Sequence, residues 1–342
     1  MNHSADETRA SLANNLRYFI KWSLIALLIG GTGGLIGSLF SMGVSFATSF
    51  RMNHPNMLFF LPVSGILIVW LYHTFHEEGN RGTNMVIDAI SSTEKVTLAT
   101  GPLIFVSTVL THIAGGSSGR EGAALQLGGS LGNLFGNAIH LDEKDKKIAI
   151  MCGMSAVFSA LFGTPVAAAI FPLEVISIGV LYYAALVPCI FSSFIGVGIA
   201  RYLGIAGEHF TVLSIPAISV SSVGWIIFLS ALCAGVSIVF CLMLHGAEHT
   251  YRKIFPNPYV RILAASAIFI LLTLLIGTRD YCGSSMPLIE RSMEGEIGYE
   301  AFFLKMLFTA IALGAGFKGG EVVPSFFIGA TFGCVVGPLL GI

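Results

Sequence analysis

A glycine-rich stretch with one carboxylate interrupts a long apolar part of the sequence at residues 115–122, which read GGSSGREG. Helix propensity rises after Gly122, so these glycines should form a loop that opens a helix. The first amides of a helix have no internal partner and carry about half a positive charge, which makes a helix start a site for an anion. Glu121 stands where that anion would bind. It could occupy the site, be displaced by an ion, or take up a proton and swing away. The simpler alternative is that Glu121 caps its helix and pairs with Arg120.

A second stretch of the same kind spans residues 314–324, which read GAGFKGGEVVP. Its glycines again run into a helix start, marked by Pro324, because proline is favoured in the first helical turn, where a missing N–H costs nothing. Glu321 is a second carboxylate at a helix start, unless it forms an interfacial ion pair with Lys318. Carboxylates inside a membrane are costly and are functional by default.

A third stretch, residues 82–88, reads GTNMVID. It resembles a short helix start in which Thr83 or Asn84 would cap the first turn. Taken alone, this stretch is better interpreted as an ordinary loop.

The elements around these loops must be membrane helices. The 342 residues are 54% hydrophobic and 11% charged, whereas soluble domains carry about 25% charged residues. Mean hydropathy is +0.81, and a formal charge of −1 excludes a strongly basic nucleic-acid binder. A membrane-spanning helix needs about 20 apolar residues. The sequence offers apolar stretches at residues 18–50, 57–76, 97–116, 148–161, 165–200, 211–247, 260–277, 299–316 and 322–341.

The first apolar stretch is too long for a signal-peptide core and is expected to be a retained span. It contains two overlapping pairs of glycines, Gly30 with Gly34 and Gly33 with Gly37, and such pairs let helices pack closely in lipid. Basic residues beside this span favour a cytoplasmic N-terminus under the positive-inside rule. They are Arg9, Arg17 and Lys21.

The two glycine-rich interruptions lie about 200 residues apart, as expected of a transporter built from two inverted repeats. We therefore predict an all-α polytopic membrane protein with discontinuous helices. Its parts would be a cytoplasmic tail at residues 1–17, a first repeat at 18–205 and an incomplete second repeat at 206–342. Charged residues 142–147 are interpreted as a solvated loop, and residues 279–296 as a polar break. The six cysteines lie singly, without metal-ligand spacing, and are expected to be buried small hydrophobes.

Taken together, the three stretches resemble the CLC family of anion channels and anion/proton antiporters. The family motif G-[KR]-E-G-P corresponds to GREGA at residues 119–123, and G-x-F-x-P corresponds to GEVVP at 320–324. The motif G-S-G-I-P corresponds to GTNMV at 82–86, and residues 156–174 resemble the helix pair behind the family's anion site. The resemblance runs from about residue 20 to the end of the chain and implies a homodimer in the cell membrane, most simply the bacterial inner membrane.

Two departures are similar to the fluoride-exporting branch of this family: Met85 near the place of the usual serine, and the string GGEV before Pro324. In that branch the resemblance implies that Glu121 is the gating, proton-carrying glutamate and that Glu321 is a second acidic group near the anion path. The implied anion-binding residues are Met85, Gly119, Arg120, Gly122, Val322 and Val323. The branch usually has threonine at position 323, and chloride/proton exchangers carry a second glutamate at position 175. This chain has valine at both, so a proton relay of the chloride type is not expected.

The expected function is therefore fluoride export coupled to proton entry, with fluoride or another halide, protons and lipid as partners. No cofactor, metal or nucleic acid and no enzymatic activity are expected. Only about 18 residues follow Pro324, where the family continues through further helices, so we expect a fragment.

The first alternative function is a chloride channel or chloride/proton exchanger of the same family. A distant alternative is an intramembrane serine protease, with Ser117 or Ser118 as nucleophile and His245 or His249 as base. A nucleotide site is weaker still, because the first glycine loop lacks the lysine and hydroxyl of a phosphate-binding loop.

Overall fold

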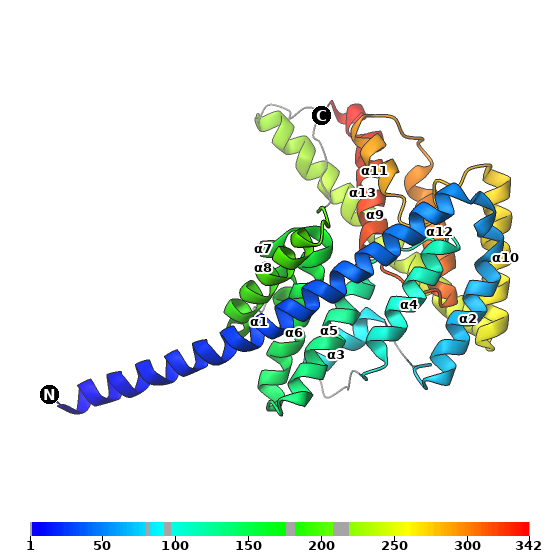
Figure 1. Ribbon diagram of the computed structural model, residues 1–342. Coiled ribbons are helices and arrows are strands. Elements are labelled where there is room, and N and C mark those ends of the chain that lie inside the picture. The colour runs from blue at the N-terminus through cyan, green and yellow to red at the C-terminus, as the bar shows by residue number, and fades with distance from the viewer. Residues whose placement is uncertain (1, 80–81, 92–96, 176–181, 208–218, 342) are drawn as a thin grey trace. The chain divides into compact units, whose positions relative to one another are not determined.

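A computed structural model describes residues 2–79, 82–91, 97–175, 182–207 and 219–341. These residues form thirteen α-helices, with short 3-10 turns between some of them (Figure 1). The helices are α1 (Asn2–Asn53), α2 (Leu61–Thr74), α3 (Thr83–Ser91), α4 (Thr100–Ile113), α5 (Glu121–Ala138), α6 (Glu143–Phe162), α7 (Pro165–Val175), α8 (Leu186–Tyr202), α9 (Val220–Ile254), α10 (Pro258–Ile276), α11 (Met286–Met293), α12 (Ala301–Ala315) and α13 (Val322–Val336).

Within these described ranges, six helical segments are long and apolar enough to cross a membrane, which confirms the predicted polytopic membrane protein. They are Leu12–Asn53, Pro55–Thr74, Tyr183–Tyr202, Val220–Ile254, Pro258–Ile276 and Val322–Leu340. The chain divides into two compact units. The first comprises Met1–Met42, Arg81–Pro102 and Ala124–Glu208, and the second comprises Gly43–Asn80, Leu103–Ala123 and His209–Ile342.

The first unit packs α1 against α6 and α8 through the predicted glycine pairs, which serve two different neighbours. A Cβ on Gly34 would lie 2.8 Å from the carbonyl oxygen of Gly196 in α8. A Cβ on Gly33 would lie 2.7 Å from the Cβ of Ala156 in α6. Because the glycines have no side chain, the helix backbones meet directly on both faces of α1.

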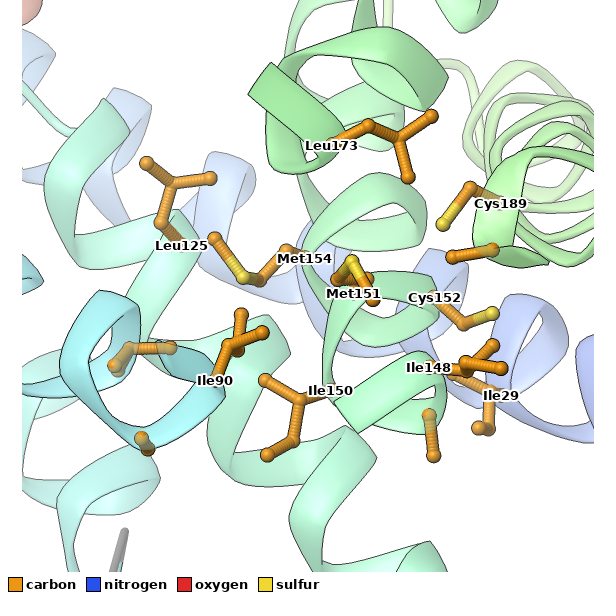
Figure 2. Close-up of a cluster of buried hydrophobic side chains, with 14 of the residues drawn as sticks. Ile29, Ile90, Leu125, Ile148, Ile150, Met151, Cys152, Met154, Leu173 and Cys189 are labelled. Carbon is orange, nitrogen blue, oxygen red and sulfur yellow. The ribbon is translucent and has the colours of Figure 1, made fainter. Parts of the chain in front are cut away.

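A hydrophobic cluster fills the rest of the first unit. Figure 2 shows side chains from several helices converging in it, among them Leu125, Met151, Met154, Cys152 and Cys189. Their burial is the main source of packing energy once the helices are in the membrane, where contacts replace the hydrophobic effect.

The second unit contains α2 and α9 to α13 and is also joined at glycines. A Cβ on Gly65 in α2 would lie 2.7 Å from Ile262 of α10, and one on Gly314 in α12 would lie 3.0 Å from the amide of Glu248 in α9. Aromatic rings complete its core, with Phe269 of α10 and Phe308 of α12 in edge contact at 4.9 Å between ring centroids.

Two local expectations were wrong, and the polar break contains a short helix. Residues 142–147 are not a loop: the Asp142 carboxylate accepts the Asp145 amide at 2.8 Å and caps α6, whose acidic first turn suits the helix dipole. The polar break at 279–296 contains α11, because Leu288, Ile289 and Ser292 recur on one buried face. Residues 82–88 begin α3 rather than an ordinary loop; Gly82 adopts a φ of 68°, and its carbonyl accepts the Met85 amide.

The apolar stretch at 165–200 is divided as well. It contains two helices, α7 and α8.

We predict that Gly34→Ala destabilises the protein by about 1–3 kcal/mol, because the new methyl group meets the Gly196 backbone and the helices must separate. The matched control is Gly31→Ala, three residues earlier on α1. Its Cβ meets only the Ile199 Cδ1 at 3.8 Å, so helix propensity should make it neutral or stabilising by up to about 1 kcal/mol. Thermal unfolding of the detergent-solubilised proteins measures both. Equal stability of the two variants would contradict the close α1–α8 contact.

Candidate functional site

The two glycine loops of the second unit are joined by a pair of backbone hydrogen bonds. The Gly119 amide donates to the Gly320 carbonyl at 2.6 Å, and the Gly320 amide donates to the Gly119 carbonyl at 2.8 Å. A side chain on Gly320 would not fit, since its Cβ would lie 2.6 Å from the Gly122 amide nitrogen. Glycine is therefore required where the two backbones touch.

This pairing brings two helix starts together. Helix α5 begins at Glu121 and α13 begins at Val322, each within two residues of the paired glycines. Both helices present their first amides, which have no acceptor within the helix, and hence the positive end of the helix dipole, to the same region of the second unit. Two such ends attract an anion without any cationic side chain.

The Glu121 side chain occupies this region. It is fully buried, and its Oε2 accepts the backbone amide of Val323 at 3.2 Å. Its other oxygen, Oε1, makes no hydrogen bond within the described part of the chain. A carboxylate of α5 thus binds the first turn of α13, where its oxygens stand in for an anion.

Neighbouring contacts hold the two loops in place. The Thr111 hydroxyl at the end of α4 accepts the Lys318 amide at 3.2 Å, and its carbonyl accepts the Gly116 amide at 2.9 Å. The Ser117 hydroxyl lies 3.0 Å from the hydroxyl of Thr309 in α12. The loops are therefore fixed by hydrogen bonds to α4 and α12, so the two helix starts are held in position.

Lys305 was missed by the sequence analysis. It lies on α12 with none of its surface exposed, and its ammonium donates to the Gly283 carbonyl at 2.7 Å and to the Ser285 hydroxyl at 2.9 Å. A single lysine in the apolar run FFLKMLF is the signal that could have found it, since charges within membrane helices are functional by default.

The structure brings most of the predicted site residues together. Gly119, Gly122 and Val323 are buried at the paired loops, while Arg120 and Val322 are half-buried. Glu321 is the N-cap residue of α13, but its side chain is exposed and does not cap the helix. Met85 lies in the first unit, on α3, among the buried residues of the hydrophobic cluster.

Two alternative interpretations find no support in the described residues. Lys318 does not pair with Glu321, because its ammonium lies over the ring of Tyr72, 4.2 Å from the centroid. The protease arrangement is also missing from this part of the chain: Ser117 contacts Thr309, and the His245 Nδ1 faces the Cys241 carbonyl of its own helix at 2.8 Å.

Comparison with known proteins identifies the family of the chain. Residues 64–342 match the family model described as voltage gated chloride channel. A chloride/fluoride channel protein of Pseudomonas syringae pv. tomato is 31% identical over 332 residues, which cover 95% of this chain and 74% of the relative. The H(+)/Cl(-) exchange transporter ClcA of Vibrio cholerae is 23% identical, with 92% of this chain and 72% of the relative covered.

Solved structures show the same fold. The crystal structure of a CLC-type fluoride/proton antiporter superposes with a TM-score of 0.90 and 32% identity, covering 95% of this chain and 82% of that one. A slow cyanobacterial Cl-/H+ antiporter superposes with a TM-score of 0.74 and 19% identity, covering 94% and 82%. The chain belongs to the voltage-gated chloride channel (CLC) family of membrane proteins.

Proposed function

We propose that this chain exports fluoride in exchange for protons, with Glu121 as the group that couples the two ions. The observation that carries the proposal is the contact between the Glu121 carboxylate and the Val323 amide, because it places a titratable group in an anion site. Ionised Glu121 and the anion compete for the same amides. Protonation removes the charge that holds Glu121 there, so the side chain can leave and the anion can enter.

Fluoride fits this site better than chloride on chemical grounds. It is small, strongly hydrated and basic, so it needs strong hydrogen-bond donors and can associate with a protonated carboxyl group. Helix-start amides provide such donors, and Glu121 and Glu321 provide two carboxyls. We assign the anion path to Met85, Gly119, Arg120, Gly122, Val322 and Val323.

The relatives support this choice of ion. The two that share 31% and 32% of their residues with this chain include fluoride in their names, whereas those at 19% and 23% are named for chloride. Chloride transport by a channel or a chloride/proton exchanger is the second candidate. The valine at position 175, where chloride exchangers carry a glutamate, argues against it.

One prediction of this proposal concerns the selectivity for the transported ion. Proteoliposomes containing the protein should release fluoride much faster than chloride, because chloride is a weaker base and a poorer partner for a protonated carboxyl. Fluoride- and chloride-selective electrodes measure both rates, with protein-free liposomes as the control. Chloride release as fast as fluoride release would favour the second candidate.

Another prediction concerns the coupling of fluoride movement to proton movement. Glu121→Gln should abolish proton-driven fluoride movement, because glutamine keeps the size but can neither become charged nor carry a proton. The result should be either a blocked protein or a passive fluoride leak. Glu143→Gln is a suitable control, since Glu143 is exposed and pairs with Lys146 in the next turn of α6. Full proton-coupled exchange in Glu121→Gln would move the coupling role elsewhere, with Glu321 the next residue to test.

We also propose that the protein is a homodimer in the bacterial inner membrane, each subunit with its own pathway. The support is the family resemblance and the apolar surface of residues 266–276, where Leu271, Leu274 and Leu275 are exposed. Cross-linking in native membranes and in detergent should trap a dimer, because apolar packing keeps the subunits together in both. A species that stays monomeric in both media would contradict the proposal.

A further inference from the structure

The interior of the second unit holds a series of buried polar atoms that make no hydrogen bond with any described residue. Leaving such a group without a partner costs about 1–3 kcal/mol, and roughly 90% or more of buried polar groups in proteins are paired, with water where no protein group is available. Seven unpaired atoms among the described residues of this unit therefore indicate sites for water. They are Arg51 Nε, the Tyr72 hydroxyl, Ser107 Oγ, Thr108 Oγ1, His112 Nε2, Ser118 Oγ and Glu121 Oε1.

Three of these groups, Ser107, Thr108 and His112, lie in the second half of α4. Ser107 and Thr111 are one turn apart, and so are Thr108 and His112, which gives two adjacent polar rows. The Thr111 hydroxyl accepts the Lys318 amide of the second glycine loop. The rows of α4 therefore end at the loops that carry the anion site.

Further polar residues continue the series at both ends of these rows. At one end, Ser118 packs against Gly319. Ser118 stands one residue before the paired Gly119 and three residues before Glu121. At the other end, the Tyr72 hydroxyl faces Ser107 without the geometry of a hydrogen bond. We call Tyr72, Ser107, Thr108, His112 and Ser118 the polar stripe.

Glu77 lies at the far end of the polar stripe, just beyond the end of α2. Its side chain is buried, with 6% of its surface exposed, and its amide donates to the Tyr72 carbonyl at 2.9 Å. One buried carboxylate, Glu77, therefore stands at one end of the stripe and another, Glu121, at the opposite end.

We propose that water molecules along the polar stripe connect Glu121 with Glu77 and that protons leave Glu121 by this route. Hydroxyl groups and water each donate and accept hydrogen bonds, so a chain of them can pass a proton from one member to the next. Protonated Glu121 gives its proton to the first water, and Glu77 takes one up from the last water. Glu77 then releases it at the membrane side where α2 ends, and Glu121 is left as a carboxylate.

The route rests on the proposed fluoride/proton exchange. It supplies the proton path that this exchange requires. Glu121 alone can accept a proton at the anion site, but the proton must then reach the other side of the membrane. The glutamate that serves chloride exchangers is replaced by Val175. The polar stripe provides a path that does not pass through that position.

The test substitutes Glu77 and its neighbour. Glu77→Gln should abolish fluoride-driven proton uptake into proteoliposomes, and Glu77→Asp should retain part of it, because it keeps the carboxylate. Glu78→Gln is the matched control: Glu78 is the next residue, is exposed, and pairs with His73. It should behave as the wild type. A pH indicator inside the liposomes and a fluoride electrode outside follow both ions together.

Wild-type proton uptake in Glu77→Gln would overturn the route, and so would an Asp variant as impaired as the Gln variant. If Glu77→Gln does not elute from a sizing column as the wild type does, Tyr72→Phe and Ser107→Ala decide. Loss of proton uptake in either one supports the route, and wild-type uptake in both overturns it. Wild-type protein that shows no fluoride-driven proton uptake would instead overturn the proposed fluoride/proton exchange itself.

Discussion

The second unit is organised around the contact between two peptide groups, those of Gly119 and Gly320. Their two hydrogen bonds, of 2.6 and 2.8 Å, join segments about 200 residues apart in the chain and bring the starts of α5 and α13 together. The positive ends of two helices repel each other, so this arrangement is favourable only with negative charge between them. Glu121 provides that charge, and it binds the Val323 amide of the other helix. The electrostatic requirement that supports the proposed anion site thus also favours a carboxylate between the two helix starts.

Much of this could be predicted from the sequence because local patterns determine it. Long apolar runs gave the spans, and the spacing of Gly30, Gly33, Gly34 and Gly37 indicated close helix packing, which the structure shows on two faces of α1. The two glycine-rich loops and their carboxylates were identified from composition alone. Hydropathy alone does not mark the break between α7 and α8, because both helices are largely apolar.

Features that depend on contacts between distant residues could not be predicted. Nothing local to Gly119 indicates that Gly320 is its partner, because a backbone hydrogen bond does not depend on the types of the residues that form it. Lys305 reads as one charge in an apolar helix, and only the fold shows that it binds the Gly283 carbonyl and the Ser285 hydroxyl. The polar stripe is a similar case. Serine and threonine are common in membrane helices, and their lack of partners becomes visible only once every neighbour is in place.

The binding groups at the meeting of the helix starts belong to the peptide backbone, and this limits what ordinary mutagenesis can reveal about them. A substitution at Val323 changes the side chain but leaves the N–H that Glu121 accepts. Reagents that modify cysteine, lysine or arginine side chains do not react with this backbone N–H either. The direct probe is replacement of the amide by an ester, which removes one donor while preserving the side chain and the shape of the chain. For the same reason, many side chains of this helix start can be substituted without altering the N–H donors. The condition is that the glycines that let the two backbones meet are retained.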